Sequence, residues 1–357
     1  MTAIAQHAPL VYTPAFFTPE KAYRNFIPDV EGAYDEGVKY AKKHGLPTAQ
    51  SLIDDGKAHA LWITDLQGDF RDNGRLPVKG TDSVVLRTTV RLLNGVCLSY
   101  YGGVIESRDG HPGQHISYGT YWRDQHDNVL DLRNHGNAAC LTLVDEKKAV
   151  FKAYGFNANG IYDIGYYQPR FDAVPPPKAK AGEKQRPDRS AVTYWNHLKD
   201  TGQGDIWVFN VHCKLGSDGA NTHPLLLEAL AFAEGALCLQ ETIVSKGHIS
   251  TTDWFGAFEP CWPDDGHPQG GLQKPILEGF KPFQTVETAG VAEDFCKYHG
   301  QRQAMTYLKG TPFFEKLRFI TDCTAAIIPN APHVAAQNEE ARLGGIKFIT
   351  HDAPLAA

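Results

Sequence analysis

The chain has 357 residues, and its 35 lysines and arginines against 41 aspartates and glutamates give a formal net charge of −6 at pH 7. This mildly acidic balance argues against a nucleic-acid backbone or an anionic membrane surface as the main partner, and no apolar run approaches the ~20 residues that a membrane helix needs. The N-terminus lacks the basic start and long apolar core of a signal peptide. The 7 cysteines are scattered and odd in number, which favours free thiols. We therefore expect a cytoplasmic protein.

Residues 1–58 are predicted to form an N-terminal extension that contains helices. Thr18, which precedes a proline, is typical of a helix start, and Gly45 is typical of a helix end. The first core strand is expected at residues 60–64. It is a short apolar run that stops at Asp65, as buried parallel strands do.

The following segments alternate between helix and strand patterns. Apolar positions recur at helical spacing over residues 81–93, and residues 103–107 form a second short apolar strand, which together suggest a βαβ unit. Further strands are expected at 205–211, 241–245, 285–289 and 316–321, and helices at 224–234, started by His223, and from Glu293. Residues 59–330 are therefore predicted to be an α/β domain, a mostly parallel sheet with helices on both faces. Residues 331–357 are predicted to be a C-terminal tail.

Residues 118–205 interrupt this alternation. They contain scattered glycines and the run Pro175-Pro176-Pro177, which are typical of turns and linkers, so we expect a long insertion that crosses the surface. Its aromatic residues are too many for a disordered linker; they are Tyr154, Phe156, Tyr162, Tyr166, Tyr167 and Phe171. They need burial against the core domain, over a pocket as a lid, or against a second subunit. We favour subunit contact in a homo-oligomer over a surface ornament.

Reactive side chains follow the ends of the predicted strands: Asp65, the pair Asp109 and His111, His212, Lys246 and Cys296. In a parallel sheet these groups gather along one edge. Asp109 and His111 are two residues apart and point to one side of an extended chain. With His212 they make a set of two imidazoles and one carboxylate that suits zinc, manganese or iron. A hydrogen-bonded Asp–His pair in a loop is the alternative interpretation.

Five motifs follow one another along the chain: Asp65-Leu-Gln-Gly-Asp69-Phe70, Ser107-Arg-Asp109-Gly-His111, Val211-His212-Cys213-Lys-Leu-Gly216, Ser245-Lys246-Gly247 with Trp254-Phe-Gly-Ala-Phe258, and Gly290-Val-Ala-Glu-Asp-Phe-Cys296. Together they resemble the motifs of the nicotinamidase branch of the isochorismatase-like cysteine hydrolases. Isochorismatases and carbamoyl-sarcosine hydrolases share the Asp, Lys and Cys elements but lack the metal set, which therefore favours the nicotinamidase branch. The resemblance covers about residues 58–330 without the insertion. It implies an isochorismatase-like, Rossmann-like three-layer fold.

The resemblance also implies a metal-dependent cysteine amidohydrolase, which converts nicotinamide and water to nicotinate and ammonia through a thioester. Cys296 would be the nucleophile, Asp65 its proton acceptor, and Lys246 the positive charge beside both. Backbone N–H groups of Ala292 and Cys296 would form the oxyanion hole, with a cis peptide between Val291 and Ala292. A cysteine at a helix N-terminus near a lysine is expected to have a lowered pKa.

The implied cofactor is one divalent metal, zinc by preference with iron or manganese as alternatives, and the implied partner is a small aromatic amide. Phe70 and Trp207, or Phe209 in place of Trp207, would pack on the substrate ring, and Gln67 would orient water or substrate. Gly110 stands where the family usually has an aromatic residue. This departure and the long insertion leave open the same chemistry on another heteroaromatic or larger amide. A catalytically idle binding or assembly protein is the alternative of another class.

Overall fold

The computed structural model describes residues 6–157, 159–170, 190–264, 267, 270–328 and 330–355. Phe171 and the predicted proline run at 175–177 lie outside these described residues. Within the described parts of the chain, no helix has the length and apolar character that crossing a membrane requires.

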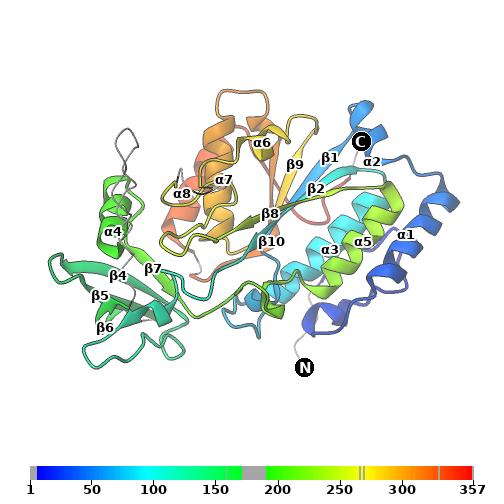
Figure 1. The fold of residues 1–357 in the computed structure, drawn as a ribbon. Coiled ribbons are helices and arrows are strands. Elements are labelled where there is room, and N and C mark those ends of the chain that lie inside the picture. Colours follow the sequence, from blue (N-terminus) through cyan, green and yellow to red (C-terminus); the bar gives the residue numbers. More distant parts are fainter. Residues whose placement is uncertain are drawn as a thin grey trace, which may run out of the picture.

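Six strands form one parallel sheet at the centre of the molecule (Figure 1). In spatial order they are β11 (Lys347–Ile349), β10 (Leu317–Ala325), β9 (Val286–Val291), β1 (His59–Thr64), β2 (Tyr101–Asp109) and β8 (Glu241–Lys246), and neighbouring strands run parallel. The chain first extends the sheet from β1 to β8 and then, on the other side of β1, from β9 to β11. A ligand crevice is expected where this direction reverses, between β1 and β9. The predicted mostly parallel sheet is confirmed.

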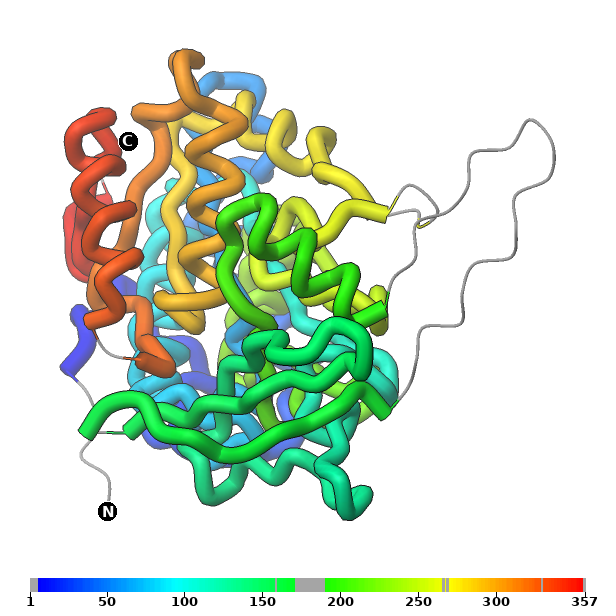
Figure 2. Tube along the Cα trace, turned by 90° about the vertical axis from the view of Figure 1, so that its left-hand side faces the viewer, coloured from blue at the N-terminus to red at the C-terminus, as the bar shows by residue number. Residues whose placement is uncertain are grey.

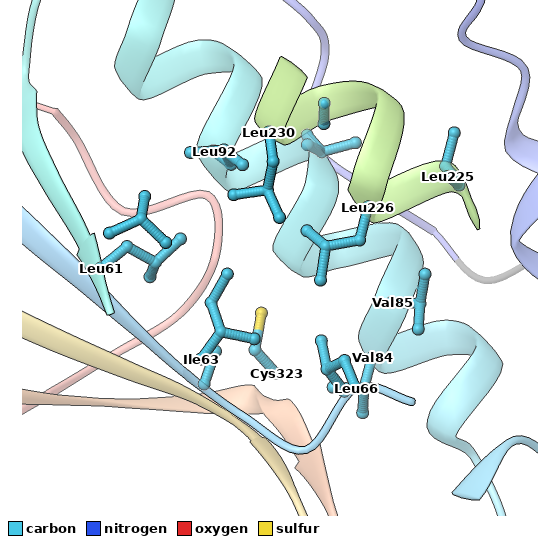
Figure 3. Packing of buried hydrophobic residues seen from close by; sticks show 14 of the residues in the cluster. Leu61, Ile63, Leu66, Val84, Val85, Leu92, Leu225, Leu226, Leu230 and Cys323 are labelled. Atoms are coloured by element: carbon cyan, nitrogen blue, oxygen red, sulfur yellow. The ribbon is translucent and has the colours of Figure 1, made fainter. Parts of the chain in front are cut away.

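Helices cover both faces of the sheet (Figure 1). One face carries α1 (Val30–His44), α3 (Thr81–Cys97) and α5 (Pro224–Leu237), and the other carries α6 (Lys274–Glu278), α7 (Cys296–Leu308) and α8 (Pro332–Leu343). Strand β1 explains this arrangement, because successive side chains of a strand point to opposite faces. Leu61 and Ile63 pack under α3 and α5 (Figure 3), whereas Ala60 and Trp62 belong to the core on the opposite face.

The N-terminal extension is helical. Its first element, η1 (Pro19–Tyr23), is a short 3-10 helix that directly follows Thr18, where the sequence predicts a helix start. Helix α1 ends at Gly45 as predicted, because this glycine takes a left-handed conformation with a φ of 66° that caps the helix. A third element, α2 (Ala49–Asp54), contacts β2.

Helices α1 and α5 cross with their backbones in contact. A Cβ atom placed on Gly235 would lie 2.1 Å from the carbonyl oxygen of Tyr34, and one on Gly37 would lie 2.2 Å from that of Phe232. Since no side chain fits between the two backbones, glycine at both positions permits this close approach. The extension is therefore packed tightly against the helical layer of the domain.

The insertion forms a sheet of its own instead of merely crossing the surface. Its strands are antiparallel neighbours in the order β3 (Trp122–Arg123), β6 (Gly160–Pro169), β5 (Val150–Asn157), β4 (Ala138–Asp145) and β7 (Ile206–Phe209). Helix α4 (Ala191–Asp200) covers one face of it, and Figure 2 shows these green strands below α4. The strand predicted at 205–211 for the parallel sheet is therefore β7 of this second sheet. A short apolar run does not reveal which strand it will pair with.

Residues 331–357 also differ from the predicted tail. They contribute α8 and β11, and β11 pairs in parallel with β10 at the edge of the sheet. The segment after β11 is held by Arg91 of α3. The guanidinium of Arg91 donates hydrogen bonds to the carbonyl oxygens of His351 and Ala353 and forms an ion pair with Glu287. The strand has only three residues, too few for a periodic pattern to identify it.

Candidate active site

The predicted reactive residues stand at the carboxyl ends of strands in the parallel sheet. Asp65 directly follows β1, and Asp109 and Lys246 are the last residues of β2 and β8, where they are paired in register. Cys296 follows β9 and is the first residue of α7, although the sequence predicts that this helix begins at Glu293. These residues meet where the direction of the sheet reverses.

Asp65, Lys246 and Cys296 form one buried cluster. The ammonium nitrogen of Lys246 lies 2.9 Å from Asp65 Oδ2 and 3.5 Å from Cys296 Sγ. The hydroxyl of Ser107 donates to the other carboxylate oxygen of Asp65 at 3.0 Å. Because all these side chains are at most 8% exposed, their interactions are little screened by water.

A glycine allows the two central strands to bring Asp65 and Cys296 together. Gly290 of β9 pairs with Thr64 of β1, and it has a φ of 115°, which favours glycine. A Cβ atom at this position would lie 2.0 Å from the carbonyl oxygen of Thr64. The close approach of β9 to β1 therefore depends on the missing side chain.

The pKa of the Cys296 thiol is raised in this cluster, chiefly by burial. Burial raises the pKa of Cys296 well above its usual value, and the charges of Asp65 and Asp109 add to this effect, which the ammonium of Lys246 only partly opposes. Burial likewise raises the pKa of Asp65, again opposed by Lys246. The lowered thiol pKa expected from sequence is wrong for this arrangement, because burial and the two carboxylates together outweigh the effect of the lysine. The cluster places a protonated thiol close to a buried proton acceptor.

Asp109, His111 and His212 bring their donor atoms within 4.8 Å of one another, and all three residues are buried. Oδ2 of Asp109 lies 2.8 Å from His111 Nε2 and 3.3 Å from His212 Nε2. The Nδ1 atoms face carbonyl oxygens, that of His111 at Gly247 (3.2 Å) and that of His212 at Asn210 (2.7 Å). A carbonyl oxygen only accepts hydrogen bonds, so each Nδ1 carries a hydrogen, and the Nε2 atom of a neutral ring presents a lone pair.

This tautomer arrangement makes the set fit a cation. Two imidazole lone pairs and a carboxylate oxygen converge on one another, and such acceptors repel unless a positive charge lies between them. Backbone carbonyls that fix the second ring nitrogen are typical of metal-binding histidines. The residues present therefore fit a divalent metal.

Gln67 has a different place from the one expected. Its side-chain oxygen accepts from the backbone N–H of Asp109 (2.8 Å), and its amide nitrogen donates to the carbonyls of Asp109 (2.8 Å) and Ala220 (2.7 Å). The side chain is fully buried and its polar atoms are occupied by backbone groups. Gln67 thus positions Asp109, whereas the sequence led us to expect contact with water or substrate.

The thiol and the metal set line one narrow cavity, whose empty space is about 370 Å³ when the open solvent at its mouth is included. The lining is mostly aromatic and aliphatic: Phe70, Leu76, Phe209, Trp254, Phe255, Ala292, Phe295 and Ile327, with the polar residues Asp109, His111, Ser117, His212, Lys246, Asp253 and Cys296. Ala292, predicted for the oxyanion hole, is in this wall, and the peptide that precedes it is cis, as expected. An aromatic and aliphatic wall of this kind suits a flat apolar ring next to the cysteine.

Phe209, and not Trp207, is the aromatic residue of β7 in the cavity wall. Both side chains lie on one face of the strand, with ring centroids 6.5 Å apart. Trp207 is further from the end of β7, where it stacks on Phe156 of the insertion at 5.1 Å and meets Phe295 edge to face at 5.0 Å. Trp207 therefore connects the insertion to the residue before the cysteine.

Asp253, Phe255 and Phe295 also line the cavity, although the sequence did not indicate them as cavity residues. Asp253 stands directly before the motif that begins at Trp254. The one signal available in the sequence was a single acidic residue next to an aromatic segment. The contacts that bring this loop to the cavity are formed with residues distant in sequence, such as the Tyr194 hydroxyl, which accepts from the Asp253 N–H.

No family model matches the sequence, and neither does any curated protein. Among solved structures, the chain is similar to the yeast nicotinamidase Pnc1p bound to the inhibitor nicotinaldehyde, at 15% identity over 82% of this chain and 99% of that one, with a TM-score of 0.48. It is also similar to an Acinetobacter nicotinamidase and pyrazinamidase (20% identity, 83% and 97% covered, TM-score 0.45). A third is the pyrazinamidase of Pyrococcus horikoshii in complex with zinc (17%, 82% and 98%, 0.42). At identities of 15–20%, these likenesses concern the fold alone.

Proposed function

We propose that this protein is a metal-dependent cysteine amidohydrolase that converts nicotinamide and water to nicotinate and ammonia. The observation that carries the proposal is that a Cys–Lys–Asp cluster and a His–His–Asp set meet at one narrow, aromatic-lined cavity. The five sequence motifs that resemble the nicotinamidase branch support the same chemistry.

Hydrolysis of an amide requires a strong nucleophile and a proton for the leaving nitrogen. Asp65 takes the thiol proton while the sulfur of Cys296 bonds to the amide carbon. The resulting oxyanion accepts hydrogen bonds from the backbone N–H groups of Ala292 and Cys296. Asp65 then protonates the nitrogen, the C–N bond breaks, and ammonia leaves a thioester on the cysteine.

The second half of the reaction uses the same groups. Asp65 removes a proton from water, whose oxygen bonds to the thioester carbon. The C–S bond then breaks, the thiolate of Cys296 takes up the proton from Asp65, and the carboxylic acid departs. Lys246 stays positively charged throughout, since the neighbouring carboxylates Asp109 and Asp65 outweigh burial and raise its pKa well above the usual value.

Asp109, His111 and His212 would hold the metal, and zinc is our first choice for this ligand set. A divalent ion bound there supplies a ligation point for the pyridine nitrogen of the substrate. Phe70 and Phe209 lie beside this set, with ring centroids 5.5 and 5.9 Å from that of His212, and would pack on the substrate ring.

Ammonia release from nicotinamide and pyrazinamide by metal-loaded protein tests the proposal. We expect turnover by the wild-type protein and none by Cys296→Ala, because the variant lacks the nucleophile. A catalytically idle protein on this fold would release no ammonia in either form. A panel of other aromatic carboxamides in the same assay distinguishes nicotinamide from another heteroaromatic or larger amide. Absence of turnover with every amide would contradict the proposed activity.

A further inference from the structure

Asp253 is a buried carboxyl group in the cavity wall that neither the cysteine cluster nor the metal set uses. The residue is 4% exposed and lies in the segment between β8 and α6. Its Oδ1 accepts a hydrogen bond from the backbone N–H of Trp254 at 3.0 Å. Its Oδ2, by contrast, has no hydrogen-bond partner among the described residues. A buried polar atom without a hydrogen-bond partner is unfavourable, so this oxygen is suited to accept a hydrogen bond from a bound molecule.

Several other polar groups around Asp253 are already engaged, although the indole N–H of Trp254 has no partner among the described residues. Its N–H donates to the hydroxyl of Tyr194 (3.1 Å), and its carbonyl accepts from the N–H of Cys261 (2.8 Å). Among the other polar residues in the cavity wall, Lys246 forms ion pairs with Asp65 and Asp109, and the hydroxyl of Ser117 is hydrogen-bonded to the ring of His115. The backbone contacts hold Asp253 in place. Since no described group donates to its free oxygen, a molecule in the cavity can supply the missing donor.

We propose that Asp253 determines substrate choice by accepting a hydrogen bond from a donor on the aromatic ring of the substrate. This inference rests on the proposed function and deepens it. The preferred substrate class is an aromatic carboxamide whose ring carries an N–H or O–H group besides the carboxamide. A ring substituent that only accepts hydrogen bonds would face a carboxylate oxygen, and an apolar one would leave that oxygen without a partner.

A matched pair of substrates tests this inference. The two nicotinamides carry an amino or a methyl group at the same ring position, so they have similar shape and differ in the hydrogen-bond donor. We expect that, at one ring position or more, the kcat/KM of the amino compound exceeds that of the methyl compound at least tenfold. The assay is run at pH 8 because burial raises the pKa of Asp253 to about 7, and the carboxylate form then predominates.

Asp253→Asn separates a selecting role from a structural one. The carboxamide oxygen still accepts from the N–H of Trp254, while an NH₂ donor replaces the free carboxylate oxygen. We expect the amino-to-methyl ratio to fall below about twofold. Both compounds are measured on the same variant, so a general loss of activity cancels in the ratio. Glu228→Gln is the matched control, because Glu228 is a buried carboxylate that pairs with Lys21 outside the cavity, and it should keep the wild-type ratio.

Equal kcat/KM values for the two wild-type substrates at every ring position, or an unchanged ratio in Asp253→Asn, would overturn the inference. Failure of the proposed function looks different, because no amide would then release ammonia. If Asp253→Asn does not fold, the dissociation constants of the two amides are measured on Cys296→Ala, which binds without turnover. At least tenfold tighter binding of the amino compound supports the inference, and equal binding overturns it.

Discussion

The ammonium nitrogen of Lys246 lies 2.9 Å from Oδ1 of Asp109, so the lysine that contacts the cysteine also contacts the proposed metal set. The same nitrogen lies 2.9 Å from Asp65. The two sets are therefore joined by one buried cation, and a change of charge in one of them changes the pKa of groups in the other.

The first prediction concerns this coupling. The charge of Asp109 contributes to the raised pKa of Cys296. Metal-free Asp109→Asn should therefore react with iodoacetamide several-fold faster than metal-free wild-type protein, because more of the thiol is ionised. Alkylation is followed by mass spectrometry of the peptide that contains Cys296, with Cys296→Ala to identify it. A slower reaction in Asp109→Asn would show that this carboxylate does not act on the thiol.

The second prediction concerns metal content. His212→Ala and Asp109→Ala each remove one of three converging ligands, so elemental analysis should find about one divalent metal per wild-type chain and a large loss in both variants. His223→Asn is the control, because it replaces a buried histidine outside the ligand set and should retain the metal. If the metal content is unchanged in one of the alanine variants, the residue substituted there is not a metal ligand.

The third prediction concerns the pH dependence of stability. His223 caps α5, since its Nδ1 accepts from the backbone N–H of Leu225 (3.1 Å), and burial lowers its pKa to about 3. In the unfolded chain the histidine pKa is ~6.5, so protons bind preferentially to the unfolded state below that pH. Stability from this group is complete above pH 6.5 and declines as the pH falls toward 3. The loss at pH 5 is about 2 kcal/mol.

Urea denaturation of wild-type protein and His223→Asn at pH 7.5 and pH 5 measures this effect. Asparagine is also a good N-cap but does not titrate. The variant should therefore lose about 2 kcal/mol less than wild type between the two pH values. Equal losses in the two proteins would mean that His223 does not control the acid sensitivity.

The fourth prediction concerns the crossing of α1 and α5. In an isolated helix, Gly235→Ala would be favourable by about 1 kcal/mol. Here the added Cβ would lie 2.1 Å from the Tyr34 carbonyl oxygen, so the two helices must move apart and the free energy of unfolding should fall by about 1–3 kcal/mol. Gly271→Ala is the control, since no described atom lies within 4 Å of its added Cβ. A stability gain in Gly235→Ala would contradict the backbone contact.

The fifth prediction concerns the outer face of the insertion sheet, opposite α4. Ile161 is 70% and Tyr166 is 55% exposed there, and Lys152 lies between Tyr166 and Tyr154. We predict that this face contacts a second subunit. The double variant Ile161→Glu with Tyr166→Glu should then lower the mass in solution, because two desolvated charges oppose association.

Light scattering measures that mass. The control is Leu343→Glu, which changes an apolar side chain that is 81% exposed at the end of α8 and should leave the mass unchanged. A monomeric wild-type protein, or a double variant that associates like wild type, would show that the aromatic face serves no subunit contact.

The sequence by itself determined the features that depend on neighbouring residues along the chain. The apolar run before Asp65 indicates a strand covered on both faces, and Gly45 and His223 mark helix ends through local backbone and capping preferences. Reactive residues that follow consecutive parallel strands meet at one edge whatever the connections contain. This rule predicts that Lys246 and Cys296 lie close together, as the structure shows, although 50 positions of sequence separate them.

Only the tertiary structure decided the features that depend on distant residues. Strand β7 belongs to the second sheet, where its Phe209 pairs with Ala138 of β4. The sequence could not show this, because an apolar run carries no information about the strand with which it pairs. The order of side chains along β7 puts Phe209, and not Trp207, at the cavity. The pKa of Cys296 rises because burial and the carboxylates of Asp65 and Asp109 act together on the thiol. Desolvation and Coulomb interactions depend on distances in space, which the order of residues does not contain.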